Sequence, residues 1–158
     1  MTDLWPEGIE INRVKSPVTI LREQGSVLGQ KTKNLVLGEV MDAGGQDNQF
    51  AYAFFIVAPA LSHYRYKLLT IHHDVGLYPV TVDVEKRISQ AIDSRFQLIQ
   101  KTPDGKDLWP YLKADSEAQF LELLREIFKS EKAIAVVTSL LSQSDPNWHA
   151  ASAGDSSS

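Results

Sequence analysis

The first half of the chain contains four apolar stretches separated by turn-forming residues. They lie at residues 35–42, 50–57, 64–73 and 78–84 and are rich in β-branched and aromatic side chains. Stretches of this length and composition, bounded by Gly, Pro, Asn, Asp or Ser, are typical of β-strands. Because the connections are short, we expect consecutive strands to pair in a mostly antiparallel sheet of four or five strands.

The two central strands differ in their polar pattern. Residues 50–57 have no polar face, so this strand is expected to be covered on both sides, either by two layers or by a partner chain. In residues 64–73, regular alternation assigns the side chains to two faces. The first face carries Tyr64, Tyr66, Leu68, Thr70 and His72, and the second carries Arg65, Lys67, Leu69, Ile71 and His73.

Apolar residues at helical spacing predict three main helices. The Ser16-Pro17 pair is typical of a helix start and predicts a helix at residues 17–29. In the second half, amphipathic patterns predict helices at residues 116–129 and 131–143. Residues 95–100 fit either the end of a further helix or a short strand.

This order of elements predicts an α+β fold with a single domain at residues 1–145. Residues 146–158 contain little apolar surface, so we expect a disordered tail. Two interpretations are open for Gly25 and Gly29 of the first helix. Either Gly29 ends the helix and Gly25 only weakens it, or both glycines let the helix backbone approach the sheet closely.

Composition removes several classes of chemistry. The 158 residues carry a formal net charge of −4 and no cysteine. Disulfides, thiolate nucleophiles and cysteine-held metals are therefore excluded. No apolar run is long enough for a membrane span, and the N-terminus does not resemble a signal peptide, so we expect a cytoplasmic protein. The acidic balance gives no general attraction for nucleic acid or anionic membranes.

Two clusters of residues were considered as sites. His72, His73 and Asp74 have side chains that suit metal binding or acid–base chemistry, but neighbouring strand residues face opposite sides, so we expect no metal and no cofactor. The segment 64–67 interleaves tyrosines with cations, as nucleic-acid-binding sheets do. On a strand its two tyrosines share one face and its two cations the other, so nucleic-acid binding is not expected.

Two classes of function follow. The chain lacks the sequence motifs of phosphate-binding loops, dinucleotide-binding folds, serine hydrolases and zinc proteases. A non-enzymatic protein-interaction or regulatory module, with a protein partner or self-association as a homodimer, is therefore favoured. The alternative is a small-molecule-binding protein or small enzyme. Its pocket would be lined by Tyr52, Tyr64, Tyr66 and His72.

Overall fold

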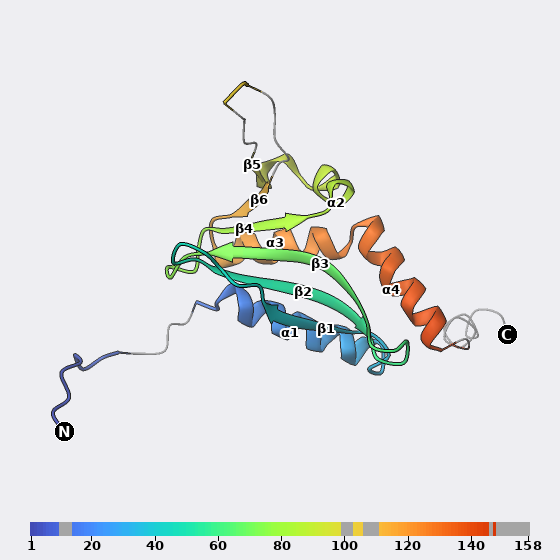
Figure 1. The fold of residues 1–158 in the computed structure, drawn as a ribbon, viewed down its shortest axis with the longest axis horizontal. Coiled ribbons are helices and arrows are strands. Elements are labelled where there is room, and N and C mark those ends of the chain that lie inside the picture. The colour runs from blue at the N-terminus through green and yellow to red at the C-terminus, as the bar shows by residue number, and fades with distance from the viewer. Residues whose placement is uncertain (10–13, 99–102, 106–110, 146, 148–158) are drawn as a thin grey trace.

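The computed structural model describes residues 1–9, 14–98, 103–105, 111–145 and 147. Its strands form one antiparallel sheet in the order β1-β2-β3-β4-β6-β5 (Figure 1). The strands are β1 (Leu37–Asp42), β2 (Phe50–Ala58), β3 (Tyr64–His73), β4 (Val80–Val84), β5 (Gln97–Leu98) and β6 (Tyr111–Ala114). The α+β fold and the four predicted strands are confirmed. The sheet has six strands because two short ones, β5 and β6, complete it.

The helices also agree with the sequence pattern. They are α1 (Pro17–Lys31), α2 (Lys86–Ala91), α3 (Glu117–Phe128) and α4 (Glu131–Ser144), with a short 3₁₀ helix at Ser94–Phe96. The hydroxyls of Ser16, Ser116 and Ser130 each accept a hydrogen bond from a backbone N–H in the first turn of α1, α3 and α4, respectively. Serine caps therefore set where these three helices begin. None of the described helices has the length and hydropathy needed to cross a bilayer.

Two regions with specific expectations are only partly described. In the segment 95–100, Arg95 and Phe96 belong to the 3₁₀ helix and Gln97–Leu98 to β5, so the strand interpretation holds for its middle. The expected disordered tail at 146–158 lies outside the described residues, apart from Asn147.

The helices pack on one face of the sheet, which we call the helix face. In Figure 1 the strands pass in front of α1 and α3, and no described helix covers the side toward the viewer, the open face. Cover of β2 by two layers is thus wrong for the described helices, whereas cover of its second side by a partner chain stays a prediction. Ala51, Ala53 and Val57 of the open face are nevertheless buried. Longer side chains from neighbouring strands shield this face, as Arg65 does above the Phe55 ring.

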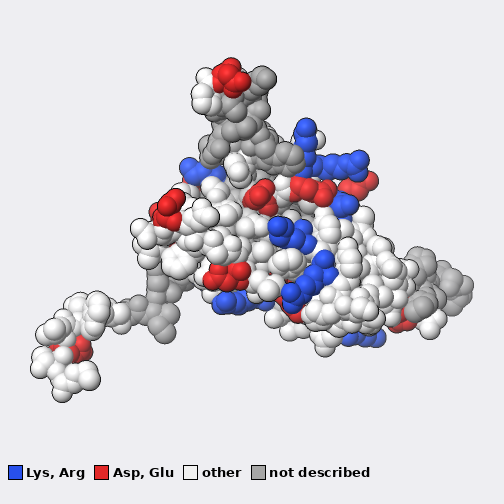
Figure 2. Space-filling view, viewed as in Figure 1, with Lys and Arg blue, Asp and Glu red and all other residues white. Residues whose placement is uncertain are grey.

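The main apolar core lies between the helix face and the helices. It includes Ile20 and Leu21 from α1, Ile71 from β3, and Phe120 and Ile127 from α3, all at most 1 % exposed. Figure 2 shows the opposite side, where Lys and Arg are interspersed with Asp and Glu. Neither sign of charge dominates that view of the surface.

A β-bulge in β3 changes its expected faces. Phe54 pairs with Leu69 and Phe55 pairs with Lys67, so Leu68 is an extra residue without a partner in β2. Leu68 and Leu69 are both buried in the core. The regular alternation predicted for 64–73 is therefore wrong beyond Leu68, and Tyr66 and His72 lie on opposite faces.

The glycines of α1 explain how closely the helix approaches β1. A Cβ added to Gly25 would lie 2.5 Å from the carbonyl oxygen of Gly38 in β1. A Cβ on Gly29 would meet the Asn34 side chain at 3.1 Å instead. The interpretation in which glycine permits close approach holds for Gly25. Gly29 does not end the helix, which continues to Lys31.

Candidate functional site

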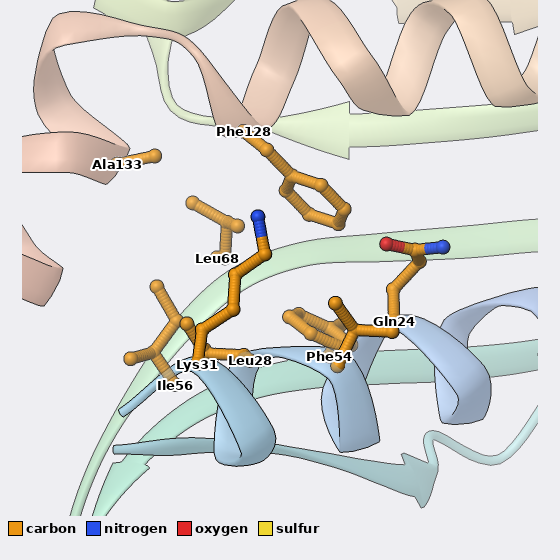
Figure 3. Close-up of a pocket in the computed structure, with 9 residues that line it drawn as sticks. Gln24, Leu28, Lys31, Phe54, Ile56, Leu68, Phe128 and Ala133 are labelled. Carbon is orange, nitrogen blue, oxygen red and sulfur yellow. The ribbon is translucent and has the colours of Figure 1, made fainter. Parts of the chain in front are cut away.

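A narrow apolar slot separates α1 from the corner between α3 and α4. Its volume is about 190 Å³, and Figure 3 shows it between the helices, above β2 and β3. We call this feature the slot. It is lined by Gln24, Val27, Leu28 and Lys31 of α1, Phe54, Ile56 and Leu68 of the sheet, and Phe128 and Ala133 of the α3–α4 corner.

The floor of the slot follows from strand periodicity and the bulge. Phe54 and Ile56 are alternate residues of β2 and therefore share the helix face. Leu68 joins them as the extra residue of β3. The three side chains are at most 3 % exposed, so the floor belongs to the packed core and is rigid in shape.

The break between α3 and α4 forms one wall. Ser130 lies between α3 and α4, and its hydroxyl caps α4 by accepting a hydrogen bond from the backbone amide of Ala133. Phe128 of the wall packs against Phe54 of the floor, with 5.8 Å between ring centroids. Ala133 presents only a methyl group, and a larger side chain at this position would fill the slot.

The mouth of the slot is polar and carries one positive charge. Figure 3 shows Lys31 extending from α1 toward Phe128, and the Gln24 amide lies on the other side of the Phe128 ring in this view. Among the described residues, no carboxylate forms an ion pair with Lys31. The lining contains no His, Asp, Glu, Ser or Thr. These described side chains can bind an apolar group next to an anion, and they include no pair of groups suited to acid–base catalysis.

Two predicted site residues lie in a different hollow. Tyr64 and Tyr66 line a groove of about 570 Å³ beside α4. The Tyr66 hydroxyl donates to Glu85 at 3.0 Å, and the Lys132 ammonium lies 5.9 Å from the centroid of the Tyr66 ring. Tyr64 is half exposed.

The other predicted residues divide between the two faces. Tyr52 stacks on the buried His73 at the far end of the sheet, with centroids 6.2 Å apart. His73 Nδ1 lies 2.7 Å from the backbone carbonyl oxygen of Asp74. The side-chain carboxylate of Asp74 accepts a hydrogen bond from the backbone amide of Gly76 in the turn that follows. His72 borders a hollow of about 450 Å³ on the open face. The structure does not gather Tyr52, Tyr64, Tyr66 and His72 around one pocket.

Metal binding has no geometric support in the described part of the chain. No group of three or more His, Cys, Asp or Glu side chains there could hold an ion. His72 and His73 point to opposite faces of β3, as regular strand geometry requires for neighbours.

The slot was missed by sequence reasoning because its residues come from five elements. One signal pointed toward its floor. The polar positions of β3 change parity, from Arg65 and Lys67 to Thr70 and His72, across the pair Leu68–Leu69. Two adjacent leucines at such a change are the pattern of a bulge with both side chains inward.

Two tyrosines near these features give a pH-dependent prediction. Burial, the hydrogen bond to Glu85, and the charges of Glu85 and Tyr64 together raise the pKa of Tyr66 to about 12, and burial contributes most. Burial, with the charge of Glu117, raises the pKa of Tyr78 to about 12. The unfolded pKa is about 10, so the unfolded chain releases these protons first. The contribution of these two raised pKa values to the free energy of unfolding is fully present below pH of about 10, and it is lost as the pH rises through about 12.

We therefore expect the free energy of unfolding to fall between pH of about 10 and 12. In Tyr66→Phe this fall should be shallower, because one titrating phenol is gone. Glu85→Gln should shift the tyrosinate absorbance of Tyr66 to lower pH. Urea unfolding at several pH values measures the first effect, and an unchanged pH slope in Tyr66→Phe would contradict the assignment.

No protein-family model, curated protein or solved structure matches this chain. The function is therefore inferred from the geometry of the described residues alone. Of the three hollows above, the slot has the most apolar lining and a floor set in the core. Its size and chemistry define the kind of ligand that fits.

Proposed function

We propose that this protein is a non-enzymatic interaction module that binds one apolar anchor side chain of a protein partner in the slot. The observation that carries this proposal is the combination of a buried apolar floor with the Lys31 ammonium at the mouth, which forms no ion pair with any carboxylate of the described residues. The anchor is expected to lie next to a carboxylate in the partner sequence.

The size of the slot favours a side chain over a larger ligand. Small-molecule sites usually have volumes of about 300–1,000 Å³. An apolar cavity of about 150 Å³ holds one benzene ring. The slot, at about 190 Å³, is therefore suited to one aromatic or branched aliphatic group. Deep insertion of single aromatic anchors is the usual way that a small area of an interface contributes most of its affinity.

The chemistry of the mouth favours a partner over an isolated hydrocarbon. The apolar contribution comes from burying the anchor's own surface together with the exposed parts of Val27, Leu28 and Phe128, and it depends on the buried area. Lys31 lies at the rim on the last turn of α1, where solvent reaches it. An ion pair at such a rim contributes mainly orientation and association rate. The slot thus selects an anchor that has an acidic neighbour.

N-acetyltryptophan provides a direct test, because it joins an indole ring to a carboxylate. We expect roughly millimolar binding, seen by NMR as shifts of the Ile56 and Leu68 methyl resonances. Ala133→Leu should abolish these shifts by filling the slot. Lys31→Glu should weaken binding severalfold, and N-acetyltryptophan amide should bind less tightly than the acid.

Two matched variants control this experiment. Ala135→Leu makes the same change on α4 but toward the groove that contains Tyr64 and Tyr66. Lys86→Glu makes the same charge reversal at the exposed start of α2. Both should bind N-acetyltryptophan as the wild type does. Loss of binding in Ala135→Leu with retention in Ala133→Leu would place the ligand in the groove and refute the proposal.

A further inference from the structure

The N-terminal residues 1–9, which we call the arm, stand clear of the body of the molecule. In Figure 1 the arm lies apart from the sheet and the helices, beyond the end of the molecule at which α1 begins. Three large apolar side chains of the arm are 66–89 % exposed, namely Leu4, Trp5 and Ile9. Several exposed large apolar side chains on one short segment are typical of an interaction site.

The arm has some local order. The amide of Trp5 donates to the Asp3 carboxylate at 3.0 Å, and Pro6 restricts the backbone directly after Trp5. Restricting a free segment in this way lowers the entropy lost when it docks. Trp5 is therefore presented on a short, partly ordered turn.

The arm and the slot are chemically complementary. Trp5 is an aromatic anchor, and Asp3 and Glu7 place a carboxylate two residues to either side of it. The slot offers the apolar floor and Lys31. The arm therefore has the features expected of a slot ligand, an anchor with acidic neighbours.

We infer that the slot binds Trp5 from the arm of a second copy of this chain, an inference that rests on the proposed function of the slot. The slot lies along the second half of α1, from Gln24 to Lys31, whereas the arm lies apart from the sheet and the helices, beyond the opposite end of α1. Because each copy carries one arm and one slot, two copies form a closed, twofold dimer by reciprocal exchange.

The dimer should be weak. One tryptophan buries about 150–250 Å². Two arms with their neighbouring residues thus fall below the roughly 1,200 Å² per interface that is usual for stable complexes. We expect concentration-dependent association, which sedimentation equilibrium of the full chain can measure.

Variants of the arm and of the slot test whether the two copies exchange their arms. Trp5→Ala removes the anchor and Ala133→Leu fills the slot, and each should weaken self-association at least about tenfold. An equimolar mixture of the two should associate more tightly than either variant alone but less tightly than the wild type, because the mixed dimer forms one of the two contacts. Lys31→Glu, an exposed substitution that leaves the core intact, should weaken association as well.

Val75→Ala is the matched control, since Val75 is an equally exposed apolar residue in the β3–β4 turn. It should associate like the wild type. A wild-type chain that stays monomeric at every concentration, or a Trp5→Ala variant that dimerises normally, would overturn the inference. Measuring N-acetyltryptophan binding by Trp5→Ala distinguishes the two proposals. If the dimer is not observed but this variant still binds N-acetyltryptophan in the slot, the proposed function stands and only the inference about the dimer is wrong.

Discussion

Replacing Gly25 with alanine is expected to lower the free energy of unfolding by about 3 kcal/mol, because the added methyl group overlaps backbone atoms. Its Cβ would lie 2.5 Å from the Gly38 carbonyl oxygen and 2.9 Å from the Gly38 carbonyl carbon. Neither atom can rotate away as a side chain would, so α1 must lift from β1. Lifting α1 would also separate Ile20 and Leu21 from the core.

Gly29→Ala is the matched control one turn along the same helix. Its Cβ would meet only the movable Asn34 side chain at 3.1 Å and the Leu37 Cβ at 3.5 Å. Alanine gains about 1 kcal/mol over glycine in a helix interior, so this variant should equal or exceed the wild type in stability. Urea unfolding followed by circular dichroism measures both variants. Equal stability of the two would show that α1 does not need the Gly25–Gly38 contact.

Of two single-residue deletions, the one that removes the smaller side chain is expected to cause the larger loss of stability. Deleting Leu68 removes the bulge and brings the pairs Phe54–Leu69 and Phe55–Lys67 into regular register. All remaining side chains of β3 keep their faces. The variant should lose about 2–5 kcal/mol, as when a buried leucine is truncated, and still unfold cooperatively.

Deleting Ala53 should be more damaging although it removes a smaller side chain. Ala53 pairs with Met41 of β1 and Thr70 of β3, and neither pairing has an extra residue in β2 that could absorb the loss. Either Tyr52 or the pair Phe54 and Ile56 must then leave the helix face. Because a typical domain is stable by only about 5–15 kcal/mol, we expect no cooperative unfolding transition. A more stable Ala53 deletion than Leu68 deletion would contradict the bulge.

Local patterns were sufficient for most of the architecture. The Ser16-Pro17 pair marked the start of α1, because capping depends on a few neighbouring residues. Amphipathic spacing was sufficient for α3 and α4. The four long strands followed from their β-branched and aromatic runs. The two-residue β5 was only one of two open interpretations and the four-residue β6 was not predicted, since strands so short contain no measurable periodicity and depend on pairing with their neighbours.

The site depended on information that local patterns do not contain. The predicted tyrosine pocket assumed regular alternation through β3, and the bulge at Leu68 separates Tyr66 from His72. The covering of β2 also could not be read from its composition. Its small open-face residues, Ala51 and Ala53, are buried without any described helix above them. The slot requires the spacing of α1 from the α3–α4 corner, which only the folded structure provides.

The most direct measurement of the central claim locates a bound indole ring relative to the slot. Intermolecular NOEs between N-acetyltryptophan and the protein's methyl groups report which side chains surround the ring. The account predicts NOEs to the methyls of Ile56 and Leu68 on the slot floor and to Ala133 on its wall. NOEs confined to Val136 and Leu140 of the α4 groove, or to Thr70 on the open face, would contradict it.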